Sequence, residues 1–96
     1  MNLTKSLNGE QLTVTVSGRL DTTTAVEFET FLNENLSSAK QLTIDCANLS
    51  YVSSAGLRVL LSMQKKLGAG LKLVNVQELV MEVFEMTGFC DILTIE

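Results

Sequence analysis

Histidine is absent from this 96-residue sequence, and cysteine occurs only twice, as Cys46 and Cys90. Without histidine there can be no histidine general base and no histidine metal ligand. The two cysteines lie far apart, and with scattered carboxylates they do not make a zinc site. Cys46 continues the apolar positions Leu42 and Ile44, so we expect a buried, reduced thiol. We expect no cofactor and no metal.

Positive charge is also scarce. The formal net charge is −4, and the nearest approach to a basic cluster is the pair Lys65 and Lys66. A nucleic-acid binder needs clustered cations to release counterions from phosphates, so we expect no nucleic-acid partner. The same charge balance argues against binding to an anionic membrane surface.

Long apolar runs are missing too. None approaches the ~20 residues of a transmembrane helix. The sequence begins directly with a strand pattern, without the apolar stretch of a signal peptide. We therefore expect a cytoplasmic protein that does not insert into membranes. With 46% hydrophobic residues, the chain can build one core, and we expect a single domain over residues 1–96.

The spacing of apolar residues predicts a series of strands and helices. Residues 3–7 and 12–17 alternate with a period of two around Asn8-Gly9, a dipeptide typical of hairpin turns. Further strands are expected at 41–46, 71–76 and 92–95. Helices are expected after Asp21, from the two serines at 53–54 to residue 67, and over 77–86. This ββαβαβαβ order predicts an α/β fold with a mixed, mostly parallel sheet, an antiparallel edge hairpin and helices packed mainly on one side.

The most informative segment leads from the third strand into the second helix. Ser53 or Ser54 is expected to cap this helix by accepting a backbone N–H bond. Capping does not explain Ala55 and Gly56 in the first turn, because Gly in a helix costs about 1 kcal/mol relative to Ala. Small residues there leave a serine hydroxyl uncovered and let another backbone approach closely. A helix N-terminus would also stabilise a phosphoryl group on the serine by roughly 0.3–1 kcal/mol.

Leu57 follows Gly56 and should point about 100° away from it on a regular helix. We therefore expect Leu57 at the edge of the inner stripe, partly exposed beside Arg58, as an anchor for a binding partner. We do not expect an enzyme. Asp21 is the one acid expected near the serines, and no base lies beside Ser54 to activate it as a nucleophile.

Two motifs together carry a resemblance to a known family. The first surrounds the start of the second helix and comprises Asp45, Leu49, residues 51–57 and residues 59–61. The second lies at the end of the second strand and comprises residues 18–21 with Thr24 and Ala25. In both motifs the sequence resembles the anti-sigma factor antagonist family, the STAS domain. The resemblance extends from the Asn8-Gly9 hairpin to the region of Gly88.

The resemblance implies a partner-switching mechanism. The unphosphorylated protein would bind an anti-sigma factor that is itself a serine kinase, and this binding would free the sigma factor. The kinase would then phosphorylate a serine at the N-terminus of the second helix, the complex would dissociate, and a phosphatase would reset the cycle. Ser54 falls on the acceptor position, and Asp21 falls on the loop beside it. The expected partner-binding residues are Asp21, Thr22, Ser53, Ala55, Gly56, Leu57 and Arg58.

Two features differ from the family pattern. The family often has an aspartate just before the acceptor, whereas this sequence has Ser53 there and hence two adjacent hydroxyls. The sequence also shows little of the family's C-terminal helix. Some STAS proteins are non-phosphorylated subunits of larger assemblies, including lipid-transport complexes, and this is the alternative function.

Overall fold

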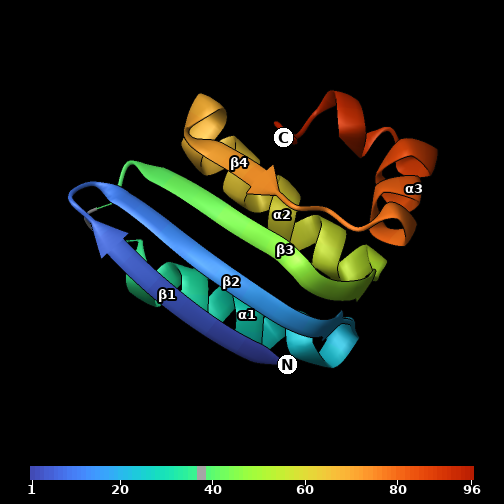
Figure 1. Cartoon of the computed structure of the whole chain (residues 1–96), viewed down its shortest axis with the longest axis horizontal. Coiled ribbons are helices and arrows are strands. Elements are labelled where there is room, and N and C mark those ends of the chain that lie inside the picture. The colour runs from blue at the N-terminus through green and yellow to red at the C-terminus, as the bar shows by residue number, and fades with distance from the viewer. Residues whose placement is uncertain (37–38) are drawn as a thin grey trace.

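A four-stranded sheet forms the centre of the protein, for which a computed structural model describes residues 1–36 and 39–96. The strands lie in the order β1-β2-β3-β4 (Figure 1). Their bounds are Asn2–Asn8 for β1, Gln11–Leu20 for β2, Gln41–Val52 for β3 and Leu71–Val74 for β4. The β1–β2 pair is antiparallel, and the β2–β3 and β3–β4 pairs are parallel. The predicted mixed sheet with an antiparallel edge hairpin is thereby confirmed.

The hairpin between β1 and β2 turns at Gly9 and Glu10, next to the predicted dipeptide. Gly9 has a φ of 65°, a left-handed conformation that a glycine adopts without steric cost. Asn8 pairs with Gln11 and Leu7 pairs with Leu12, so the two-residue turn sets the register of the whole ladder.

Two helices cover one face of the sheet. Figure 1 shows α1 (Thr22–Asn35) and α2 (Ser54–Leu67) behind the strands, and α3 (Glu78–Thr87) beside one end of the sheet. The core lies between this face and the helices. It includes Leu12, Val14 and Val16 of β2, Leu42, Ile44 and Cys46 of β3, Ala25, Phe28 and Leu32 of α1, and Val59, Leu60 and Met63 of α2.

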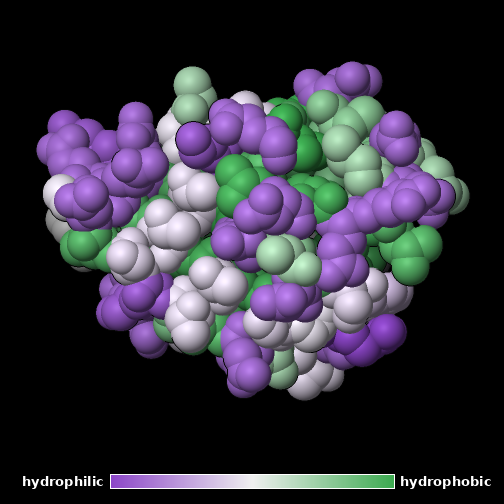
Figure 2. Space-filling view, viewed as in Figure 1, coloured by the Kyte–Doolittle hydropathy of each residue, from purple (hydrophilic) through white to green (hydrophobic). Residues whose placement is uncertain are grey.

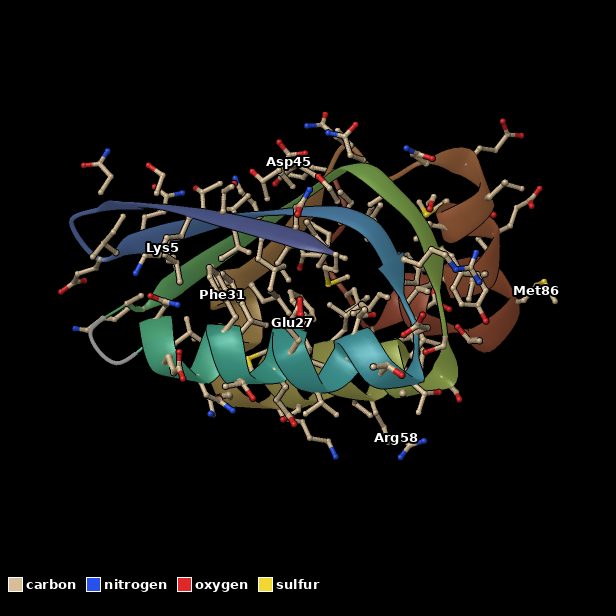
Figure 3. All side chains as sticks on the ribbon, turned by 90° about the horizontal axis from the view of Figure 1, so that it is seen from below. Lys5, Glu27, Phe31, Asp45, Arg58 and Met86 are labelled. Atoms are coloured by element: carbon tan, nitrogen blue, oxygen red, sulfur yellow. The ribbon has the colours of Figure 1, made fainter. Side chains whose placement is uncertain are left out.

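The opposite face of the sheet carries short polar side chains. Thr13 and Thr15 of β2 and Thr43 of β3 alternate with the core residues and therefore point to this side. In Figure 2 side chains of intermediate hydropathy, drawn white, lie on this face among hydrophilic and hydrophobic ones. In Figure 3 Asp45 projects from the same face, away from the helices. The helices are thus packed mainly on one side, as predicted.

Several strand boundaries differ from the sequence-based expectation: β2 continues to Leu20 and β4 ends at Val74, where ends at 17 and 76 were expected. β3 continues through Val52, beyond the loop expected near Asn48, because β2 pairs with it as far as Leu20, with two shifts in register along the way. The expected last strand at 92–95 is wrong. A 3₁₀ turn at Phe89–Asp91 lies just before this segment, and among the described residues one isolated bridge, Leu73 to Ile95, joins the segment to β4.

The helices found in residues 1–36 and 39–96 include none with both the length and the apolar character that crossing a bilayer requires.

Candidate functional site

The ends of β2 and β3 bring the starts of two helices together. Leu20 and Val52 are paired in the parallel ladder, and each is followed by the residue that caps a helix. Those caps are Asp21 for α1 and Ser53 for α2. The Ser53 N–H donates to the Leu20 carbonyl (2.8 Å), which closes the junction. Segments more than thirty residues apart therefore form one surface, at the carboxyl edge of the sheet.

The Asp21 carboxylate is committed to capping α1. Its Oδ1 accepts from the backbone N–H groups of Thr23 (3.0 Å) and Thr24 (2.9 Å), and the Asp21 N–H donates to Thr24 Oγ1 (2.8 Å). The backbone N–H of Thr24 is the main reason why the pKa of Asp21 lies below its ordinary value, and burial opposes it. A carboxylate held in this way is a poor proton acceptor, so it does not supply the missing base for Ser54.

The two adjacent serines have different environments. Ser53 is half-buried, and its Oγ accepts from the Gly56 N–H (3.3 Å), which makes it the N-cap of α2. Ser54 is the first residue of α2 and is exposed. Among the described residues, no side-chain or backbone group is hydrogen-bonded to the Ser54 hydroxyl. The sequence did not decide which of the two serines caps α2, and the structure shows that it is Ser53.

Gly56 is a packing position. A Cβ atom there would lie 2.7 Å from Leu20 Cγ and 3.0 Å from Val52 Cγ2, closer than carbon atoms approach without strain. The missing side chain thus lets α2 pack closely against the ends of β2 and β3. Gly56 is buried and does not form part of the accessible surface.

Leu57 does not lie at the exposed edge of α2. It is only 7% exposed, so the prediction of a partly exposed Leu57 is wrong. The buried side of α2 is wider than its own spacing suggests, because Gly56, Leu57, Val59, Leu60 and Met63 are all buried. An exposed anchor for a partner must therefore be sought elsewhere on this surface.

The remaining predicted residues lie on or beside a groove between α1 and α2. The groove has a volume of about 480 Å³. It is lined by Thr22, Ala25, Val26 and Glu29 of α1 and by Ala55, Arg58, Val59 and Ser62 of α2. Thr22, Ala55 and Arg58 were expected on this surface from the sequence, whereas Val26 and Glu29 were not. An apolar Val26 on the otherwise polar side of α1 was the available signal.

One further contact joins the two strand ends. The Arg19 guanidinium lies 4.1 Å from the centre of the Tyr51 ring, and the two residues are paired in the ladder. Such cation–π contacts hold a cation over an aromatic face. Arg19 is thereby oriented one residue before the Leu20–Val52 junction.

Within residues 1–36 and 39–96, no three His, Cys, Asp or Glu side chains are grouped so as to hold a metal ion. Cys46 is buried as predicted, and burial raises the pKa of its thiol to about 12, with a smaller contribution from the charge of Asp45. The chemistry present at the junction is therefore that of exposed hydroxyls, a guanidinium and short apolar side chains.

Comparison with known proteins gives a consistent result. A family model described as "Mlab, STAS domain" matches residues 3–94. The anti-sigma-B factor antagonist of Bacillus subtilis (strain 168) is 31% identical over 98 residues, covering 99% of this chain and 90% of the relative. The relative is named as an antagonist of another protein and not as an enzyme, which agrees with the prediction of a non-enzymatic regulator.

Solved structures agree with this result at the level of the fold. An anti-sigma factor antagonist from Mycobacterium paratuberculosis has a TM-score of 0.87 at 23% identity, over 98% of this chain and 83% of that chain. SpoIIAA, an anti-sigma factor antagonist, has a TM-score of 0.81 in its unphosphorylated form, at 18% identity over 99% of this chain and 88% of that chain. The phosphorylated form of the Bacillus SpoIIAA has a TM-score of 0.74, at 17% identity over 99% and 91%.

Proposed function

This chain belongs to the STAS domain family, and we propose that it is an anti-sigma factor antagonist controlled by phosphorylation of Ser54. In this proposal the unphosphorylated protein binds an anti-sigma factor that is also a serine kinase. The kinase releases itself by phosphorylating Ser54, and a phosphatase restores the binding form. The full-length relation to the Bacillus subtilis antagonist supports the first part of the proposal.

We choose Ser54 over Ser53 as the phosphorylation site because the two hydroxyls have different environments. The Ser54 hydroxyl is exposed and has no hydrogen-bond partner among the described residues, so a kinase can reach it without breaking a contact. The Ser53 hydroxyl caps α2, and its phosphorylation would disrupt that bond. A phosphate on Ser54 would also lie at the positive end of the α2 dipole, which is favourable for an anion.

Phosphorylation would change the surface on which the partner docks. A phosphoserine adds about −1.5 to −2 charge and three acceptor oxygens at neutral pH. Thr22, Ala55 and Arg58 line the groove between α1 and α2, and Ser54 directly precedes Ala55 in α2. A partner that fits these short side chains would have to desolvate the phosphate, so phosphorylation is expected to weaken the complex.

The kinase reaction tests the acceptor directly. The partner would be isolated from the source cell with tagged protein, identified by mass spectrometry, purified and incubated with ATP. We expect one phosphoryl group on the wild type and on Ser53→Ala, and none on Ser54→Ala. Ser53→Ala is the matched control, because it removes a hydroxyl one residue away and lowers helix stability by about 0.5–2 kcal/mol. Labelling that persists in Ser54→Ala would place the acceptor elsewhere.

Charge at the same position tests the switch. Ser54→Asp and Ser54→Glu should weaken partner binding in titration calorimetry while leaving the unfolding transition unchanged. Carboxylates imitate a phosphate incompletely, so the loss should be smaller than that caused by authentic phosphorylation. An unchanged dissociation constant for both variants and for the phosphoprotein would refute the switch.

A second candidate function is a non-phosphorylated STAS subunit that docks permanently in a larger assembly, such as a lipid-transport complex. Ser53 favours it, because the aspartate that often precedes the acceptor in the family is replaced here. In that case the isolated partner would carry no kinase activity, and the complex would be insensitive to ATP. The same isolation experiment therefore separates the two functions.

A further inference from the structure

The groove between α1 and α2 offers an apolar slot that the chain itself does not fill. Ala25 and Val59 are buried in it, and Ala55 is half-buried. The two alanines leave space where longer side chains would close the gap between the helices. Val26 lies in the lining with 67% of its surface exposed. A partner residue entering here would cover an apolar surface that now faces water, which is favourable.

The two sides of the groove carry opposite charges. Glu29 belongs to the α1 side and Arg58 to the α2 side. The ion pairs within residues 1–36 and 39–96 are Lys40–Glu10 and Lys72–Glu96, so neither groove charge is neutralised by them. Figure 3 shows Arg58 projecting from α2 on the side away from the sheet. A ligand can therefore reach the guanidinium without displacing another group.

We propose that this groove holds an aliphatic side chain of the partner protein, with a carboxylate of the same partner segment against Arg58 and a cation towards Glu29. The proposal rests on the antagonist function and adds the chemistry of the partner segment. A helix with a Leu, Ile or Val flanked by one acidic and one basic residue fits this description. Two opposite charges on facing sides also fix the direction in which such a segment lies.

Arg58 links the groove to the switch serine. It follows Ser54 by four residues on the same helix, the spacing at which side chains meet on one helical face. A phosphate on Ser54 is a strong, bidentate acceptor for a guanidinium. In the phosphorylated protein Arg58 turns to the phosphate, and the groove loses the cation that recognises the partner's carboxylate. Release then follows from this loss as well as from the added charge.

A small probe tests the groove without the partner. 3-Methylbutanoate combines an aliphatic branch with a carboxylate, and 3-methylbutylammonium has the same branch with a cation. In ¹⁵N-labelled protein we expect 3-methylbutanoate to shift the amide signals of Ala25, Ala55 and Ser62. Arg58→Gln should weaken this binding about twofold to fivefold, as for an exposed charge pair, and Lys66→Gln should not. Lys66 is the control because it is an exposed cation near the far end of α2.

The purified kinase partner supplies the second measurement. Val26→Glu should weaken its binding at least tenfold, whereas Leu79→Glu should change it less than twofold. Leu79 on α3 is the matched control, because it is apolar and 68% exposed, as Val26 is 67% exposed. Circular dichroism of both variants checks that the fold is retained.

The possible outcomes separate this inference from the proposed function. Labelling of Ser54 with equal binding by Val26→Glu and Leu79→Glu would refute the groove and leave the antagonist function standing. Groove binding of 3-methylbutanoate by a protein that is never phosphorylated would refute the switch but support the groove. Shifts spread over the whole surface, or an Arg58→Gln variant that binds both probes as the wild type does, would overturn the proposed recognition. Loss of self-association in Val26→Glu, measured by sedimentation, would assign the groove to a second copy of the chain.

Discussion

Replacement of Gly56 by alanine should destabilise the protein even though alanine is the better helix former. The added Cβ would lie 2.7 Å from Leu20 Cγ and 2.8 Å from Leu20 Cδ2, about 1 Å closer than the usual 3.5–4.0 Å contact. Leu20 is only 1% exposed, so any shift of its side chain has to be accommodated within the core. Overpacking of this kind costs about 1–3 kcal/mol.

The helix propensity of alanine offsets part of this cost. Alanine gains up to about 1 kcal/mol over glycine in a helix. The net loss expected for Gly56→Ala is therefore about 1 kcal/mol, which lowers the melting temperature by about 4–8 °C in a domain of this size. Ser62→Ala, on the exposed side of the same helix, is the control and should be neutral or slightly stabilising.

Urea unfolding of a double-mutant cycle isolates the contact. In a Leu20→Ala background the clash with Leu20 is removed, so Gly56→Ala should cost less than in the wild type or become stabilising by up to about 1 kcal/mol. Val52→Ala provides a second background, because Val52 Cγ2 is the other close atom at 3.0 Å. If Gly56→Ala stabilises the wild type, or destabilises all three backgrounds equally, the packing explanation for this glycine is incorrect.

Three further predictions concern burial and charge. Leu57→Ala and Leu60→Ala should each lose about 2–5 kcal/mol of unfolding free energy, because both leucines are buried. A loss below about 1 kcal/mol for Leu57→Ala would show that this side chain is not buried. The lowered pKa of Asp21 means that its contribution to stability is present above the ordinary value of 3.8 and is lost as pH falls through the folded value. Denaturation at decreasing pH should therefore show wild type losing its advantage over Asp21→Asn, and a constant difference would contradict this. A thiol reagent should modify Cys90 in the folded protein and Cys46 only after unfolding, because burial raises the Cys46 pKa to about 12; equal rates would disprove its burial.

The position of most helices and strands could be read from local patterns. The alternation of Leu12, Val14 and Val16 predicted a half-buried strand, and the Asn8-Gly9 dipeptide predicted the hairpin beside it. These features depend on neighbouring residues, so no knowledge of the tertiary structure was needed. The prediction of a last strand was wrong because strand formation also depends on distant residues. A short apolar segment such as 92–95 does not reveal whether the edge of another strand is available along its whole length.

In the candidate site, too, some features could be predicted from the sequence and others required the tertiary structure. The capping residue Ser53 could be recognised as a cap candidate, because an N-cap acts on backbone groups two or three residues away. The choice between Ser53 and Ser54 could not be made from the sequence, because it depends on the backbone conformation at the start of α2. The resemblance to the STAS family identified the region but not which of its side chains are exposed.

By itself, the sequence determined the succession of strands and helices, the turn at Gly9 and the candidates for capping, because these follow from contacts between residues close along the chain. Only the tertiary structure decided that Leu57 is buried, that Gly56 accommodates Leu20, and that Val26 borders a groove with Arg58. The reason is that burial is set by segments distant in sequence. The parallel pairing of β2 with β3 places the starts of α1 and α2 side by side, and no pattern within either helix records that neighbour.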